Sequence, residues 1–68
     1  MTRNDFIEQV CNMLVLNKSM IELCNVTSME RYPYERVIAI CEKTLFYLEK
    51  GFSFEKAREF WYRSIDAL

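Results

Sequence analysis

The sequence has no histidine, one glycine and one proline among its 68 residues. Without histidine it lacks the most common general base, the usual partner of a nucleophilic serine or cysteine, and the most common metal ligand. One glycine cannot build a glycine-rich phosphate-binding loop. Cys11, Cys24 and Cys41 are an odd set without CxxC spacing, and a cysteine-only zinc site normally needs four thiolates. We therefore predict that the chain is not an enzyme and uses no cofactor and no metal.

Long apolar runs and an excess of either charge are also missing. Apolar runs such as Met13 to Leu16 are far shorter than the ~20 residues of a membrane span. Nine basic residues are interleaved with ten acidic ones, whereas nucleic-acid binding proteins usually carry clustered positive charge. The first residues are polar, unlike a secretory signal. We expect a cytoplasmic protein with no membrane partner and no nucleic-acid partner.

The apolar content is high for so short a chain. Hydrophobic residues make up 51% of it and aromatic residues 15%. A domain of this size buries only about 60% of the surface that its unfolded chain exposes. We expect residues 1–68 to form one domain, with some apolar surface left for a partner. All three cysteines have apolar neighbours in helical patterns, which predicts buried, reduced thiols.

The first segment has the pattern of an amphipathic helix. Thr2 is suited to cap it, with Asp5 in its first turn. Six apolar residues follow at helical spacing: Phe6, Ile7, Val10, Cys11, Leu14 and Val15. The polar residues 17–19 then interrupt the pattern. Two interpretations remain: a separate short helix near 18–25 capped by Asn17, or one bent helix over 3–25.

Pro33 and Gly51 divide the rest of the chain. The residue before a proline avoids helical geometry, so we predict a boundary at Tyr32 and a helix over 33–50 that begins at Pro33. Gly51 is suited to end that helix, and Ser53 to cap a last helix over 53–68. Phe6, Phe46, Phe60 and Trp61 are expected mostly in the core. The predicted fold is all-α, a small three- to four-helix bundle with a C-terminal αα-hairpin.

The segment 48–61 offers an alternative function. A glycine, an apolar residue and a serine cap follow one another between two predicted helices. This pattern resembles the turn of DNA-binding helix-turn-helix domains, which implies a small DNA-binding or transcription-modulating protein. Glu55 and Glu59 would then face phosphates, which disfavours this interpretation.

The aromatic residues favour binding to another protein. Tyrosine, tryptophan and arginine are enriched where protein interfaces gain most of their energy. The residues predicted to form an interface are Tyr32, Tyr47, Phe54, Arg58, Tyr62 and Arg63. We therefore predict a non-catalytic protein–protein interaction module whose partner the sequence does not identify.

Two narrower hypotheses accompany this prediction. Very short domains without catalytic residues are common among phage and mobile-element inhibitors of host complexes, such as anti-CRISPR proteins. Alternatively, the chain is a structural homodimeric subunit. The dimer is suggested by a second apolar side of helix 33–50, formed by Ile40 and Tyr47, because small domains often offset a thin core by dimerising.

Overall fold

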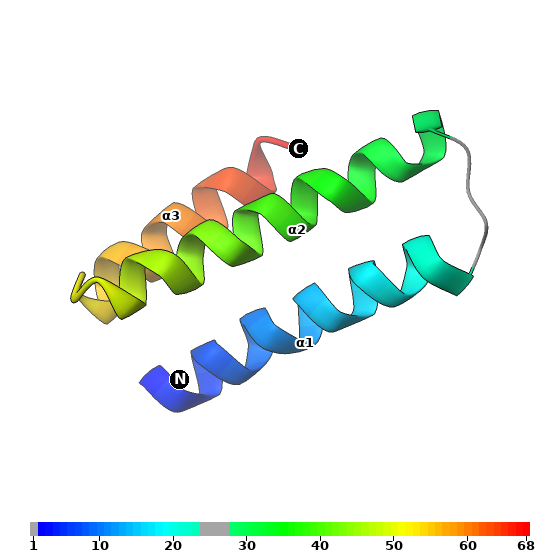
Figure 1. The fold of residues 1–68 in the computed structure, drawn as a ribbon. Coiled ribbons are helices and arrows are strands. Elements are labelled where there is room, and N and C mark those ends of the chain that lie inside the picture. Colours follow the sequence, from blue (N-terminus) through cyan, green and yellow to red (C-terminus); the bar gives the residue numbers. More distant parts are fainter. Residues whose placement is uncertain (1, 24–27) are drawn as a thin grey trace.

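The computed structural model describes residues 2–23 and 28–68. In chain order these residues form α1 (Arg3–Leu23), α2 (Ser28–Glu49) and α3 (Phe54–Asp66), with no strand among them. Figure 1 shows α1 and α2 running in opposite directions, and α3 turning back along the second half of α2. The prediction of an all-α protein is confirmed.

The start of α1 follows the predicted capping chemistry. The backbone N–H of Asp5 donates to Thr2 Oγ1 at 3.1 Å, and the N–H of Thr2 donates to Asp5 Oδ2 at 3.3 Å. These reciprocal bonds satisfy donors that the first helical turn would otherwise leave unpaired.

The separate helix predicted near 18–25 is wrong for the described part, because α1 continues without a break to Leu23. Residues 24 and 25 lie outside the described residues. The reason is visible at Asn17, which does not accept a bond from a new helical turn as a cap would. Its Nδ2 donates instead to the Met13 carbonyl one turn earlier, at 2.7 Å.

The predicted start of α2 at Pro33 is also wrong. The helix begins at Ser28, so Tyr32 and Pro33 lie inside it. A proline in the second turn removes one backbone hydrogen bond but does not prevent helical geometry on both sides. Arg31 Nε and Glu35 Oε1 lie 3.4 Å apart across the proline, one turn of helix from each other.

The connection between α2 and α3 matches its prediction. Gly51 has a φ of 93°, which only glycine adopts readily. Its N–H donates to the Leu48 carbonyl and the N–H of Phe52 donates to the Tyr47 carbonyl, the pair of bonds that defines a Schellman motif. Ser53 then caps α3 by accepting from the N–H of Lys56 at 3.3 Å. Four residues, 50–53, therefore suffice to reverse the chain.

The core lies where the three helices meet. Its buried apolar residues are Phe6, Val10, Cys41, Leu48, Ala57 and Trp61. Phe6 joins the first and last helices, since its ring makes edge contacts with Phe54 at 5.5 Å and Trp61 at 6.1 Å between ring centres. Thr44 is buried among these residues, and its hydroxyl donates to the Ile40 carbonyl at 2.8 Å, so this buried hydroxyl is paired.

Several core predictions need correction. Phe46 was expected in the core but is 49% exposed, and Val15, expected on the apolar face of α1, is 63% exposed. The supposed second apolar side of α2 is partly covered instead. Ile40 packs against the core, and the Tyr47 ring lies 5.2 Å from that of Phe60 on α3. The exposed side of α2 is therefore the side of Phe46, and not the side of Ile40 and Tyr47 that the sequence suggested.

Candidate functional site

The six residues predicted to form an interface do not lie together. Tyr32 is near the start of α2 and is 60% exposed, whereas Tyr47, near its end, is half-buried. The other four residues are on α3: Phe54, Arg58, Tyr62 and Arg63. Tyr62 and Arg63 are exposed there, and the Arg63 guanidinium is 2.6 Å from the Glu59 carboxylate.

Two of these residues, Phe54 and Tyr47, pack between helices, and a third, Arg58, packs on Phe54 within α3. Phe54 packs against the core through its edge contact with Phe6. The Arg58 guanidinium lies over the outer side of that packing, 5.0 Å from the centre of the Phe54 ring. Tyr47 contacts the rings of Phe52 and Phe60. Their first role is structural, although Tyr47 also borders the surface described next.

One exposed surface combines aromatic and basic side chains in a regular order. Its residues, which we call the outer face of α2, are Tyr32, Arg36, Ala39, Lys43, Phe46 and Lys50. All six are exposed. They recur at alternating intervals of four and three residues, which keeps them on one side of a helix. Lys50 follows the last helical residue, but its N–H still donates to the Phe46 carbonyl at 3.0 Å.

Each cation of the outer face lies over an aromatic ring. The Arg36 guanidinium is 5.6 Å from the centre of the Tyr32 ring, and Lys50 Nζ is 5.4 Å from that of Phe46. Lys43 Nζ lies between two rings, 5.9 Å from Tyr47 and 5.7 Å from Phe60. Cations within about 6 Å of a ring centre are attracted to its electron-rich face. Each such contact is worth about 0.5–1 kcal/mol at an exposed site, so it favours positions of the cation near the ring.

A line of carboxylates runs beside this surface. Glu35, Glu42 and Glu49 each precede one of the three cations in the sequence, and all are exposed. Glu35 pairs with Arg31. Among the side chains that the structure describes, no ion pair joins Arg36, Lys43 or Lys50 to a carboxylate. The outer face thus presents three positive charges next to a parallel negative edge.

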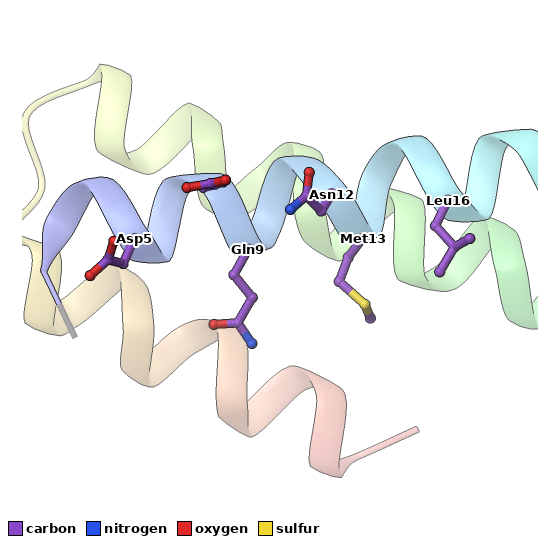
Figure 2. A pocket seen from close by; sticks show the side chains of 6 residues that line it. Asp5, Gln9, Asn12, Met13 and Leu16 are labelled. Carbon is purple, nitrogen blue, oxygen red and sulfur yellow. The ribbon is translucent and has the colours of Figure 1, made fainter.

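Two hollows on the surface are lined by described residues. One, of about 410 Å³, is lined only by α1 residues, five of which are labelled in Figure 2: Asp5, Gln9, Asn12, Met13 and Leu16. A hollow on one helix is open to solvent and lacks opposing walls that would enclose a small molecule. The second, of about 270 Å³, lies where Leu68 meets Tyr32, Pro33, Arg36 and Val37. It borders the start of the outer face of α2.

Two groups among the described residues have a shifted pKa. Burial, with a smaller contribution from nearby Cys11, raises the pKa of the Cys41 thiol to about 11, so this thiol is a poor nucleophile. Cys11 and Cys41 are free, the first half-buried and the second buried, and Cys24 lies outside the described residues. Hydrogen bonds from the backbone and the hydroxyl of Thr2 lower the pKa of exposed Asp5, which is the effect of a helix cap.

The described residues also contain no cluster of three or more side chains that could hold a metal ion. Over those residues, no helix has an apolar stretch long enough to cross a bilayer. Comparisons of the chain with models of protein families, with characterised proteins and with solved structures found no match.

The sequence pattern did not identify the outer face, because the exposure of its residues depends on how the helices pack. Of its members, the sequence indicated only Tyr32. The seven-residue spacing of Arg36, Lys43 and Lys50, repeated by Glu35, Glu42 and Glu49, could have shown it. That signal becomes informative only once Phe46 is known to be exposed.

Proposed function

We propose that this chain is a non-catalytic protein–protein interaction module and that the outer face of α2 contacts its partner. The observation that carries the proposal is the regular combination of exposed aromatic rings and held cations along that face. Aromatic residues and arginine are enriched in protein interfaces, and exposed apolar patches rimmed by polar groups commonly mark them.

Rigidity also supports this use of the surface. The face lies on a continuous helix anchored in the core by Cys41 and Leu48, so the backbone positions that carry its side chains are fixed relative to one another. The cation–ring contacts further restrict Arg36 and Lys43. Less conformational entropy is then lost when a partner binds. An inhibitor of a host complex, encoded by a phage or a mobile element, is a narrower form of the same proposal.

The other functions have less support. For DNA binding, Glu55 and Glu59 are exposed on α3, the helix that would enter the groove, and carboxylates there repel phosphates. The homodimer stays a prediction, but its original motive is weakened because Ile40 packs against the core and the half-buried Tyr47 contacts Phe60 of α3.

Photo-crosslinking in an extract of the source cell tests the proposal. Ala39 is exposed at the middle of the outer face, so p-benzoylphenylalanine at this position should leave the core intact. The matched control carries the same probe at Glu8, which is exposed on α1. We expect a discrete protein conjugate from position 39 and not from position 8. Absence of any protein conjugate at position 39, or identical conjugates at both positions, would contradict the proposed function.

A further inference from the structure

The spacing of the outer face of α2 is the spacing at which one helix packs along another. Alternating steps of four and three residues form the contact line of paired helices, in which side chains of one helix fit between those of its neighbour. Tyr32, Ala39 and Phe46 occupy one position of this seven-residue repeat, and Arg36, Lys43 and Lys50 the other. The face extends over roughly 27 Å of helix, enough for about five turns of a partner.

The charge of the face defines the complementary surface. The three cations recur every seven residues, rest on aromatic rings and make no ion pair with a described carboxylate. A partner helix with carboxylates at the same interval could meet all three at once. Between them, its apolar side chains would pack on the rings and against Ala39, whose small side chain leaves room for a larger one.

A second copy of this chain fits the face poorly. If two copies of α2 paired in parallel, Arg36, Lys43 and Lys50 would meet their own equivalents at the centre of the contact. If they paired in opposite directions, the line of Glu35, Glu42 and Glu49 would face itself along one edge. Each arrangement places like charges together, which disfavours pairing.

Nucleic acid fits poorly as well. A phosphate backbone carries a charge on every nucleotide and would bring some of them against these three glutamates, and the net charge of the chain is −1. A helix with one carboxylate in every seven residues can instead direct its charges to the cations and away from this edge.

We propose that the outer face of α2 binds an amphipathic helix of another protein, one that carries a carboxylate every seven residues between apolar side chains. This inference rests on the proposed function and specifies the element that the partner contributes.

Two synthetic peptides test it. Both are fluorescein-labelled helices of three seven-residue repeats with leucine on the contacting side. One carries glutamate at a single position of each repeat, and the matched control carries glutamine there. Fluorescence anisotropy against the full chain should show the glutamate peptide binding about tenfold more tightly, because three partly exposed charge pairs are gained. Added salt should reduce that difference.

Charge reversal on the protein supplies the second arm. The triple variant R36E/K43E/K50E should lose about tenfold in affinity for the glutamate peptide and little for the glutamine peptide. The control variant R3E/K18E/K56E reverses the same number of exposed charges away from this face and should bind as the original does. Circular dichroism establishes that both variants fold.

Several outcomes would overturn the inference. These are equal binding of the two peptides, no binding of either, tighter binding of a labelled oligonucleotide, or self-association through the face in ultracentrifugation. The crosslink from Ala39 separates this failure from failure of the proposed function. If a protein is captured but its conjugated segment is not an acidic helix, the acidic-helix inference is wrong and the proposed interaction module is still supported. If no protein is captured, the proposed interaction module itself is contradicted.

Discussion

At the N-terminus, α1 is held by two hydrogen bonds between Thr2 and Asp5, one in each direction. The carboxylate accepts one of them, so the bond is stronger when Asp5 is ionised. This places a small pH-sensitive element at a position that touches neither the core nor the outer face of α2.

We predict that the first turn of α1 loosens in acid. The hydrogen bonds from Thr2 keep the pKa of Asp5 below its ordinary value of 3.8 in the folded chain. A lowered pKa means that this stabilisation is complete above the ordinary value and is lost as the pH falls through the lower, folded value. Carboxyl NMR titration should show the lowered pKa, and Thr2→Ala should move it part of the way back because the N–H of residue 2 remains. An unchanged Asp5 titration in Thr2→Ala would contradict this assignment.

The two described cysteines should differ in reactivity. Burial raises the pKa of Cys41 to about 11, so very little thiolate exists near neutral pH, whereas Cys11 is half-buried. In the native protein at pH 8, an alkylating reagent should modify Cys11 well before Cys41, as peptide mapping by mass spectrometry would show. If Cys11 and Cys41 were alkylated at equal rates in the folded protein, without denaturant, Cys41 would lie outside the core.

At the scale of the elements, the local sequence favours a start of α2 at Pro33, whereas the helix in the structure begins at Ser28. Pro33 lies in its second turn, where it removes one backbone hydrogen bond, yet the helix extends back to Ser28. The side chains that follow, Cys41 and Leu48 among them, anchor the helix in the core. Packing downstream therefore holds a helix that local preference would start later.

Replacing this proline should stabilise the protein. Pro33→Ala restores the missing N–H and removes the clash with the preceding turn, which is worth roughly 1–3 kcal/mol after the entropy gained by the unfolded chain is subtracted. Urea unfolding followed by circular dichroism measures the difference. If the helix began at Pro33, as the sequence alone suggested, the substitution would be neutral or destabilising.

The contrast between helix ends explains what the sequence could and could not predict. Thr2, Gly51 and Ser53 were assigned correctly because capping depends on a few neighbouring residues. The start of α2 could not be assigned that way, since it depends on packing many residues later.

Burial and the candidate site depend on contacts across the chain. Phe46 and Tyr47 are adjacent and both apolar, but only the position of α3 decides that Tyr47 meets Phe60 while Phe46 stays exposed. The outer face of α2 is exposed because α3 packs in that position. The spacing of its charges can be read from the sequence, whereas its exposure cannot.

At the scale of the whole molecule, a small cluster of rings joins the first and last helices. Trp61 is buried, and its ring meets Phe6 of α1 at 6.1 Å. α3 has only 13 residues, so it spans roughly 20 Å against roughly 33 Å for α2. Figure 1 shows it beside the second half of α2 alone. Stability should therefore be concentrated at that end of the molecule.

Trp61→Ala should cost about 3–5 kcal/mol, as expected for removing a large ring from a core. Tyr62→Ala is the matched control, because Tyr62 is the next residue and is exposed. Its loss should change stability by less than about 0.5–1 kcal/mol. Thermal unfolding compares the two variants. Similar melting temperatures for Trp61→Ala and the original chain would mean that the ring cluster does not hold the helices together.

The order in which the helices pack has a consequence for the rate of folding. α1 packs on α2 and α2 packs on α3, so the main contacts join neighbours in the chain, and Phe6 adds the longest-range closure. Helical proteins dominated by such local contacts fold in microseconds to milliseconds, because little loop entropy is lost before contacts form. Temperature-jump relaxation of Trp61 fluorescence should thus be a single exponential faster than about 10 ms. Relaxation over seconds would show that the slow step is something other than docking of successive helices.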